Sequence, residues 1–408
     1  MTVEELTLNT HTYGGETLGR LADGRAVFVP HTLPGEKVRI ETVIEKPRYA
    51  KARMLEILNP SPERITPRCP HFGVCGGCHY QHLSYENQLI AKTDILIDQL
   101  KRIGKIEDPP VEAVVPSPQP WGYRVDAQFH ISTAGQLGFQ AAHAQGIVPI
   151  DECPVLAPAI DQLKPQIDIE SIPGLERVSL RMGSGEDMML IFESSDPEPF
   201  SMNLDFPISV IHRGPKGYLV LAGEDFVVTK VKERAFRISA GSAFRIHPQM
   251  GAAIVDTVLD GLPLTPSSTV LFAYAGIGLI SAFTAPHVRR LVAIESSPSA
   301  GNDFAINLDE FENVDLYQAA VENVLPTLDL KPDYIVVEPP RSGIERHALD
   351  GMLALAPGII VYISTDPSTL ARDAQRLSHG GYSIQRLIPF DLFPQTYHIE
   401  SISFWEKS

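Results

Sequence analysis

Segments that read alternately as strands and helices fill the C-terminal part of the sequence. The strand-like segments STVLFAYAG, RRLVAIES, DYIVVEPP and GIIVYIST are separated by helix-like segments, among them NDFAINLDEF, ALDGMLALA and PSTLARDAQRLSHG. This alternation predicts a doubly wound α/β sheet, and no other pattern in the sequence narrows the choice of fold as far. Two β-rich segments follow, at residues 382–393 and 397–407, and we expect them to pair in antiparallel fashion at the edge of the sheet.

The part of the chain before this alternation reads differently. A chain of 408 residues is too long for one ordinary core. Short strands and turns over residues 6–58 predict a small closed five-stranded barrel, whereas residues 84–102 have helical periodicity. Residues 121–235 are again strand-like. We therefore expect three domains: a small β-barrel at 1–60, a mostly β central domain at 61–235 and an α/β domain at 236–408.

The charge pattern bears on nucleic acid as a partner. The net charge of −16 argues against it, because phosphates would be repelled. Between Lys37 and Arg68, however, eight basic residues stand against four acidic ones, a local balance of +4. Small barrels can bind single-stranded nucleic acid through a strand face with basic and aromatic side chains. The residues that suit this role are Lys37, Arg39, Arg48, Tyr49, Lys51 and Arg53. A solvated face, on a barrel that only caps or links, is the alternative.

Nothing in the sequence directs the chain to a membrane. The N-terminus MTVEELTLNT is acidic and lacks the apolar stretch of a secretory signal. No run of about 18 apolar residues occurs. We therefore expect a cytoplasmic protein whose thiols stay reduced.

All four cysteines of the chain are candidates for one metal site. Cys69, Cys75 and Cys78 have the spacing C-x5-C-x2-C, and Gly76–Gly77 permit a tight turn between them. Cys153, in DECPVLAP, is the only candidate for a fourth ligand. Four thiolates fit tetrahedral zinc or a [4Fe–4S] cluster. Three close cysteines with one distant Cys-Pro favour the cluster; zinc and unliganded thiols remain the alternatives.

The carboxyl ends of the predicted strands carry candidate ligand-binding residues. In an open α/β sheet the ligand sits beyond these ends. The first loop contains Tyr274, Gly276 and Gly278 but lacks the full G-x-G-x-x-G of a dinucleotide site. Glu295 ends the second strand, where a carboxylate can accept both hydroxyls of a ribose. This pair of features suits adenosine without a pyrophosphate and points to S-adenosylmethionine, although a plain turn and a surface glutamate would look the same.

The order of the motifs is more specific than any one of them. A small barrel is followed by CPHFGVCGGCHYQH, GYRVDAQFH, DECPVLAP, YAGIG, EPPRSG, STLARD and FPQTYHIE. In this order the chain resembles the iron–sulfur RNA (uracil-5)-methyltransferases, which make 5-methyluridine in 23S rRNA and have relatives that act on tRNA. The resemblance covers nearly the whole chain, from residue 6 to residue 405.

The resemblance implies a fold, two cofactors and a partner. The fold would be a TRAM/OB-type β-barrel, a mostly β central domain with an iron–sulfur site, and a class I (Rossmann-like) methyltransferase domain. The cofactors would be a [4Fe–4S] cluster on the four cysteines and S-adenosylmethionine. The partner would be rRNA or tRNA, with no membrane and no obligate protein partner.

The resemblance also implies a catalytic mechanism, but this chain lacks one of the residues that the mechanism uses. In the family a Cys thiolate adds to C6 of uracil, C5 takes the methyl group, and a base then removes the C5 proton. That Cys lies in a motif like SCNPxTLARD, whereas this chain reads ISTDPSTLARD and has Thr365 in its place. An unassisted hydroxyl is not measurably ionised at neutral pH. The four cysteines match cluster positions, so none is left for this role, while Glu400 in YHIE matches the base.

Three further positions depart from the family's pattern. SFFQVN appears as SAFRIH, so Arg245 stands where a Gln contacts the cofactor, and the Asp of DLYCG is replaced by Phe272. DPPR becomes EPPR, which moves the carboxylate, now Glu338, by roughly 1 Å. The cofactor positions that match are Tyr274, Gly276, Gly278 and Glu295.

Two functions fit these departures. The first is an altered S-adenosylmethionine-dependent RNA methyltransferase, because losing the Cys does not forbid methylation of a nucleophilic RNA nitrogen or hydroxyl. The second is a catalytically inactive RNA-binding protein that keeps the barrel, the cluster and the sheet. A retained cofactor pocket would favour the methyltransferase. The inactive RNA-binding protein, in contrast, could tolerate Arg245 and Phe272 inside that pocket.

Overall fold

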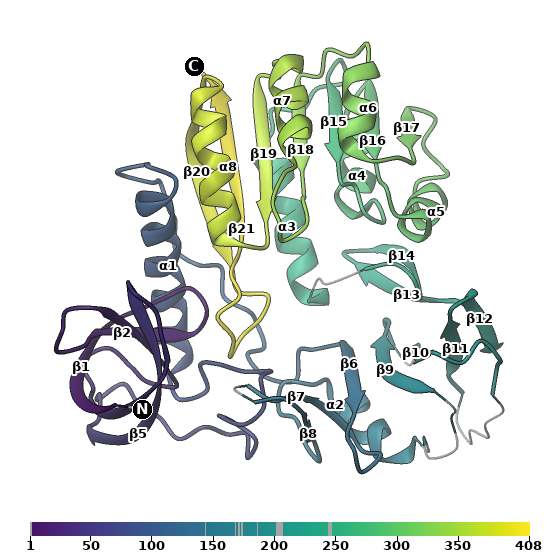
Figure 1. Ribbon diagram of the computed structural model, residues 1–408. Coiled ribbons are helices and arrows are strands. Elements are labelled where there is room, and N and C mark those ends of the chain that lie inside the picture. The colour runs from purple at the N-terminus through teal and green to yellow at the C-terminus, as the bar shows by residue number, and fades with distance from the viewer. Residues whose placement is uncertain are drawn as a thin grey trace.

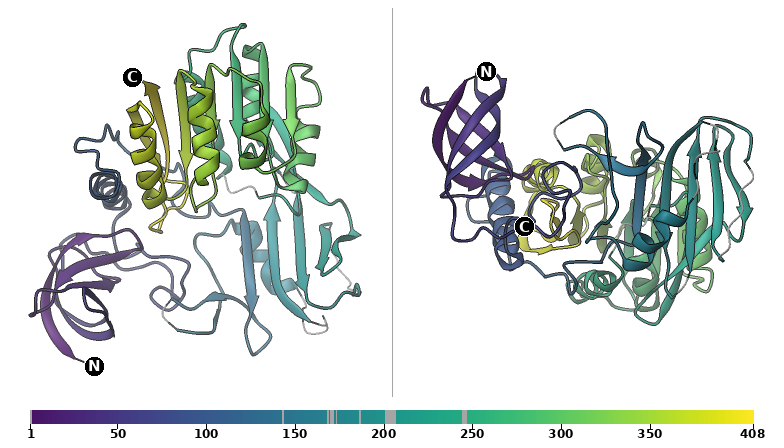
Figure 2. Two further views of the ribbon diagram at one scale, coloured as in Figure 1. Left: turned by 45° about the horizontal axis from the view of Figure 1, so that its top comes forward. Right: turned by 90° about the horizontal axis from the view of Figure 1, so that it is seen from below.

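The structure is a computed structural model that describes residues 2–408 except 143, 168, 170, 171, 173, 186, 201–206 and 244–246. Figure 1 shows an N-terminal barrel, a sheet from the middle of the chain, and a C-terminal sheet flanked by helices. The C-terminal sheet lies above the middle sheet, and the barrel stands to one side next to helix α1 (Figures 1 and 2). The predicted α/β fold with a small N-terminal barrel is confirmed.

The N-terminal barrel is closed, with the strand order β1-β2-β3-β5-β4. Its strands are β1 (Val3–His11), β2 (Glu16–Arg20), β3 (Ala26–Pro30), β4 (Lys37–Glu45) and β5 (Tyr49–Asn59). Alternate residues of a strand point to opposite faces, which is why Val27 and Val29 on β3, and Val38 and Ile40 on β4, are fully buried. The alternation seen in the sequence therefore fills the inside of the barrel.

Helix α1 (Tyr85–Arg102) follows the segment with three of the cysteines. It begins at Ser84, whose side chain accepts a hydrogen bond from the Asn87 amide. Lys92 on its buried face donates to Asp391 at 2.6 Å, and both side chains are fully buried. Loss of either partner would leave a buried unpaired charge, at a cost of about 3–5 kcal/mol. This ion pair fastens α1 to the loop that follows the last strand but one.

The middle sheet has seven strands in the order β12-β11-β10-β9-β6-β7-β8. The strands are β6 (Asp126–Ile131), β7 (Leu137–Gln140), β8 (Ile147–Pro149), β9 (Leu175–Met182), β10 (Met188–Ser194), β11 (Ser209–Gly214) and β12 (Gly217–Ala222). The short helix α2 (Pro158–Leu163), continued by η1 (Lys164–Gln166), buries Ile160 and Leu163 against this sheet.

A two-stranded hairpin links the middle sheet to the C-terminal part. It consists of β13 (Phe226–Val231) and β14 (Arg234–Ser239), and neither strand is among the predicted ones. Val227 and Phe236 of the hairpin share a core cluster with Ile191 of the middle sheet and with Ile254 and Phe304 further along the chain. The same hydrophobic core therefore contains residues from before and after position 235. The predicted domain boundaries at 60/61 and 235/236 stay predictions.

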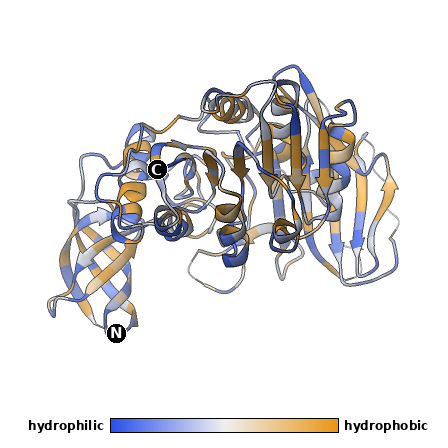
Figure 3. Ribbon diagram, turned by 90° about the horizontal axis from the view of Figure 1, so that it is seen from above, coloured by the Kyte–Doolittle hydropathy of each residue, from blue (hydrophilic) through white to orange (hydrophobic). Residues whose placement is uncertain are grey.

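The C-terminal sheet has the order β17-β16-β15-β18-β19-β21-β20. Its strands are β15 (Thr269–Ala273), β16 (Arg290–Ile294), β17 (Val314–Tyr317), β18 (Tyr334–Val337), β19 (Ile359–Ser364), β20 (Tyr382–Phe390) and β21 (Glu400–Lys407). Strands β15 to β19 are parallel, and β20 and β21 form the expected antiparallel pair at one edge. Figure 3 shows the strands in the middle of this sheet as hydrophobic.

Helices cover both faces of this sheet. They are α3 (Pro248–Asp260), α4 (Leu279–Thr284) with η2 (Ala285–His287), α5 (Pro298–Asn307), α6 (Val321–Val324) with η3 (Leu325–Thr327), α7 (Arg346–Leu355) and α8 (Pro367–His379). The helix expected at 302–311 begins earlier because Ser297 caps it and Pro298 occupies its first position. In the described part of the chain, no helix combines the length and hydrophobicity needed to cross a bilayer.

Candidate functional site

The loop after β15 has an unusual backbone. Tyr274, Gly276 and Gly278 have φ angles of 59°, 57° and 85°. At Gly278 a Cβ would lie 2.4 Å from Leu308 Cδ1, so only glycine fits. Tyr274 is not glycine, and a non-glycine residue at such a φ costs on the order of 1 kcal/mol or more. Backbone strain of this kind concentrates at binding and catalytic sites.

Glu295 holds this loop in place. It follows β16 and is 8% exposed. Its Oε2 accepts a hydrogen bond from the Gly276 amide at 2.8 Å, and its Oε1 accepts one from the Ser297 amide at 2.7 Å. An ionised carboxylate has about four acceptor positions, so Glu295 keeps acceptor capacity for a ligand while it orders the loop.

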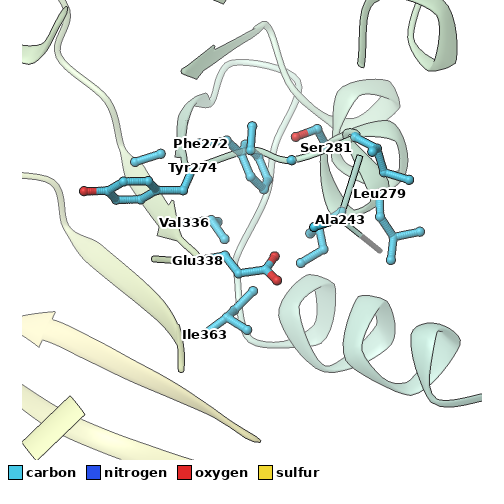
Figure 4. Close-up of a pocket in the computed structure, with 13 residues that line it drawn as sticks. Ala243, Phe272, Tyr274, Leu279, Ser281, Val336, Glu338 and Ile363 are labelled. Carbon is cyan, nitrogen blue, oxygen red and sulfur yellow. The ribbon is translucent and has the colours of Figure 1, made fainter. Parts of the chain in front are cut away.

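A small cavity lies against this loop and the ends of β15, β18 and β19. It has a volume of about 70 Å³, and Gly276, Glu338 and Ile363 are among the residues that line it. Figure 4 shows the Phe272 ring and the Glu338 carboxylate in the same space, with the Tyr274 ring directed away on the other side. Pockets for whole ligands measure roughly 300–1,000 Å³. This cavity alone therefore accommodates only a small part of a ligand.

A larger cavity of about 710 Å³ begins on the other side of Tyr274. Ser296, Val321 and Pro340 line it beyond the ends of β16, β17 and β18. Burial, helped by the charges of nearby glutamates, raises the pKa of Tyr274 to about 12, so its hydroxyl stays protonated at neutral pH. The two cavities meet at Tyr274, at the edge where an open α/β sheet binds its ligand.

Thr365 and Glu400 belong to the ends of two paired strands. Ser364 at the end of β19 pairs with Ser401 of β21, Thr365 follows Ser364 where the chain turns out of the sheet, and Glu400 begins β21. Thr365 Oγ1 is buried and has no hydrogen-bond partner among the described residues. Glu400 is 8% exposed. Glu338 follows β18, which is the next strand to β19.

One predicted site residue lies outside the described residues. This is Arg245, in the segment 244–246. On either side of this segment, Ala243 lines the small cavity and His247 lines a third, larger cleft.

The four cysteines line one cavity, although Cys153 is 75 residues from Cys78 in the sequence. Burial raises the pKa of all four thiols, to about 12 for Cys78. Backbone amides face three of the sulfurs; the Gly77 amide, for example, donates to Cys75 Sγ at 3.3 Å. No three His, Cys, Asp or Glu side chains among the described residues form a group that could hold a metal ion.

The third cleft runs between the barrel, the middle sheet and the C-terminal sheet. Its volume is about 1,020 Å³. Its basic residues are Lys51, Arg124, Arg181 and Arg341, and its aromatic residues include Tyr123, Phe139, Phe393 and Tyr397. The residues of the loop before Glu400, which hangs below the C-terminal sheet in Figure 1, line one wall.

The basic face that the sequence predicts on the barrel is largely neutralised. Arg39 forms ion pairs with Glu5 and Glu56, and Arg53 pairs with Glu41. Lys37 and Lys51 also have acidic partners. Since these pairs are exposed, each is worth about 0–1 kcal/mol, but together they offset the positive charge that attracts phosphate.

Sequence reasoning missed two contacts at this site. Tyr13, in the loop between β1 and β2, donates a hydrogen bond to Asp366 at 2.7 Å. Arg341, in the EPPR motif, lies 3.5 Å from Nδ1 of His398. The FPQTYHIE motif could have pointed to His398, but no pattern near Tyr13 indicates its role.

Comparisons with known proteins agree on one family. The family described as tRNA (uracil-5-)-methyltransferase matches residues 200–408, and the TRAM domain matches residues 2–55. An uncharacterised RNA methyltransferase of Halalkalibacterium halodurans is 33% identical over 99% of this chain and 97% of its own length. An uncharacterised RNA methyltransferase of Thermotoga maritima is 31% identical over 98% of both chains.

A solved structure has the same fold over nearly the whole chain. It is the tRNA (uracil-54, C5)-methyltransferase of Pyrococcus abyssi in complex with S-adenosyl-L-homocysteine, with a TM-score of 0.74 and 23% identity. The match covers 98% of this chain and 100% of that one. Together with the sequence relatives, these matches show that this chain belongs to the tRNA (uracil-5-)-methyltransferase family of RNA methyltransferases.

Proposed function

We propose that this chain is an S-adenosylmethionine-dependent RNA methyltransferase that does not form a covalent adduct with uracil. The observation that carries the proposal is the buried, unpartnered hydroxyl of Thr365 directly after β19, while all four cysteines line another cavity. The acceptor is then an RNA nitrogen or hydroxyl rather than the poorly nucleophilic C5 of uracil.

The two cavities that meet at Tyr274 would hold the cofactor. Adenosine would occupy the larger cavity, and Glu295 would use its remaining acceptor positions for the ribose hydroxyls. The methionine end would reach the small cavity beside Gly276 and Glu338. S-Adenosylmethionine supplies an activated methyl group when bound. The family membership and the geometry of the glycine loop both support this assignment.

The carboxylates would handle the proton of the acceptor. An RNA nitrogen or hydroxyl that gains a methyl group must lose its proton, and a positioned carboxylate can take it. Glu400 is the better candidate, because it begins β21, the strand that pairs with β19 up to the residue before Thr365. The unpartnered hydroxyl of Thr365 can donate a hydrogen bond to an oxygen of the bound base.

The four cysteines would hold a [4Fe–4S] cluster. Their donor set fits, since buried thiols without a cation are protonated, whereas cluster-bound thiolates accept hydrogen bonds from backbone amides like those of Gly77. In a cluster the thiolates bind separate iron atoms, so they stand farther apart than around a single ion. Such a cluster would join the segment 69–78 to the loop at Cys153.

RNA would lie in the large cleft rather than on the neutralised strand face of the barrel. Two of the four basic side chains of the cleft, Lys51 and Arg181, are paired with Glu16 and Asp126. Arg124 and Arg341, which form no ion pair among the described residues, stand with aromatic rings in the same cleft, and this combination binds single strands. Thr396, Tyr397 and His398 line its wall, and Glu400 follows His398 by two residues in the sequence.

Calorimetric titration of S-adenosylmethionine into the purified full chain tests the enzyme proposal. Micromolar binding is expected. No binding would leave the second candidate, an RNA-binding protein without turnover. That candidate is favoured by Phe272, whose ring occupies the cavity where the family has a carboxylate and which leaves only about 70 Å³.

A further inference from the structure

The barrel reaches the reaction site through one side chain. The Tyr13 hydroxyl donates to Asp366 Oδ2 at 2.7 Å, across 353 positions of the sequence. Asp366 directly follows Thr365. The barrel is therefore in direct contact with the residue next to the position of the missing nucleophile.

The other carboxylate oxygen of Asp366 starts helix α8. Oδ1 accepts hydrogen bonds from the amides of Ser368 at 2.9 Å and Thr369 at 3.0 Å. Burial opposes ionisation of Asp366, but the hydrogen bonds that it accepts outweigh burial and lower its pKa. The carboxylate thus bridges the barrel and the first turn of α8, and Thr365 lies immediately before this bridge.

The loop that carries Tyr13 is itself held tightly. The Tyr13 ring packs edge-on against Tyr397, with 5.4 Å between the ring centroids. Gly15 has a φ of 83°, and a Cβ there would lie 2.9 Å from Cβ of His79. His79 follows Cys78, and its ring lies 4.5 Å from that of Tyr397. The loop is therefore wedged between the cysteine segment and the segment before Glu400.

The same loop lines the cleft. Gly14 and Gly15 belong to its wall, together with Arg341 and Tyr397. A ligand in the cleft would thus touch the loop on one side, while Tyr13 contacts Asp366 on the other.

We propose that Tyr13 is a positioning residue of the methyl-transfer site. Its hydrogen bond fixes the position of Asp366 and thereby that of Thr365, and this makes the barrel part of the site. The effect of Tyr13 on methyl transfer rests on the proposed function; the contact itself does not. RNA that lies against Gly14 and Gly15 then stabilises the arrangement of Asp366 that the reaction requires.

Tyr13→Phe tests this inference in the full chain, because it removes the hydroxyl and keeps the ring contact with Tyr397. Tyr334→Phe is the matched control, since it removes a hydroxyl that donates to the Pro263 carbonyl at 2.9 Å at the amino end of β18. Rates are measured with labelled S-adenosylmethionine and in-vitro-transcribed tRNA and rRNA. We expect kcat to fall about ten- to hundredfold in Tyr13→Phe, with KM for RNA unchanged, and both values to stay unchanged in the control.

A double-mutant cycle with Asp366→Asn assigns the effect to the contact. The double variant should lose no more than the larger single loss, because both changes remove one interaction. Additive losses would overturn the inference, as would a KM effect without a kcat effect, or an equal loss in Tyr334→Phe.

Amide hydrogen exchange separates this inference from the proposed function. In Tyr13→Phe the exchange of the Ser368 and Thr369 amides should rise about tenfold, and in the control it should not change. If the unaltered chain transfers no methyl group to the transcripts, the proposed catalysis fails, and the exchange result alone decides whether Tyr13 positions Asp366. Unchanged exchange would overturn the inference in either case.

Discussion

Ser364 at the end of β19 pairs with Ser401 of β21, so Thr365 directly follows one residue of this last pair and Glu400 directly precedes the other. By the resemblance of the sequence motifs, Thr365 matches the position of the family's nucleophile and Glu400 that of its base. All four cysteines line another cavity. On our proposal, the reaction site therefore offers a hydroxyl in place of a thiol.

Thr365→Cys should restore covalent attack on uracil. A thiol at pH 7 is a few per cent thiolate, whereas the hydroxyl is not measurably ionised. With RNA that contains 5-fluorouridine, we expect this variant to form a complex that survives denaturing electrophoresis. The unaltered chain and Thr365→Ser should form none. An adduct at Thr365 in the unaltered chain would contradict this prediction.

Cys75→Ala should remove the proposed cluster. The loss of one thiolate breaks the four-ligand set, and we expect iron and acid-labile sulfide to fall from about four each per chain to a small fraction. The melting temperature should fall as well, since metal-binding free energy is folding free energy. Val74→Ala is the control in the same loop, because Val74 is 59% exposed. Stoichiometric zinc in the unaltered chain would argue against the cluster.

Glu295→Gln should weaken cofactor binding. The amide nitrogen of Gln would face one of the two backbone amides that the carboxylate now accepts from, either that of Gly276 or that of Ser297. Hydrogen bonds to a charged group are worth about 1.5–3 kcal/mol, so we expect calorimetry to show an affinity for S-adenosylhomocysteine about ten- to hundredfold lower. The exposed Glu312→Gln is the control. Equal affinities in the two variants would contradict the assignment of Glu295.

Buried His82 should make stability depend on pH. It is 1% exposed, and burial lowers its pKa to about 3, below the value of about 6.5 in an unfolded chain. The stabilisation of the neutral form is complete above pH 6.5 and is lost as pH falls toward 3, because the unfolded chain binds a proton that the folded chain does not. Between pH 6 and pH 4 the free energy of unfolding should therefore fall by about 1.4 kcal/mol for each pH unit. Urea unfolding at several pH values gives the free energy of unfolding as a function of pH. This free energy should change less steeply with pH in His82→Gln than in the unaltered chain, and equal dependences would contradict the prediction.

Much of the fold follows from local patterns, because alternation within strands and helical periodicity depend only on neighbouring residues. The antiparallel pair at residues 382–407 was predictable in the same way, and its pairing sets Glu400 opposite Phe390. The short strand β17 could not be predicted from the sequence, because its four residues are half or fully exposed and form no hydrophobic run.

The electrostatics of the barrel could not be predicted from a count of charges. Arg39 faces Glu56 and Glu41 faces Arg53 across β4 and β5, and this register decides that the charges cancel. The contact between Tyr13 and Asp366 is likewise a consequence of how the barrel docks, so no local signal marks it.

Nucleoside analysis after a methyl-transfer assay tests the central claim most directly. RNA transcripts of 23S rRNA and tRNA are incubated with the purified full chain and labelled S-adenosylmethionine, digested, and separated by liquid chromatography with mass spectrometry. We predict label in a nucleoside methylated at nitrogen or at a hydroxyl, and none in 5-methyluridine. Label in 5-methyluridine would contradict the account, because it would show that C5 is methylated without the thiol.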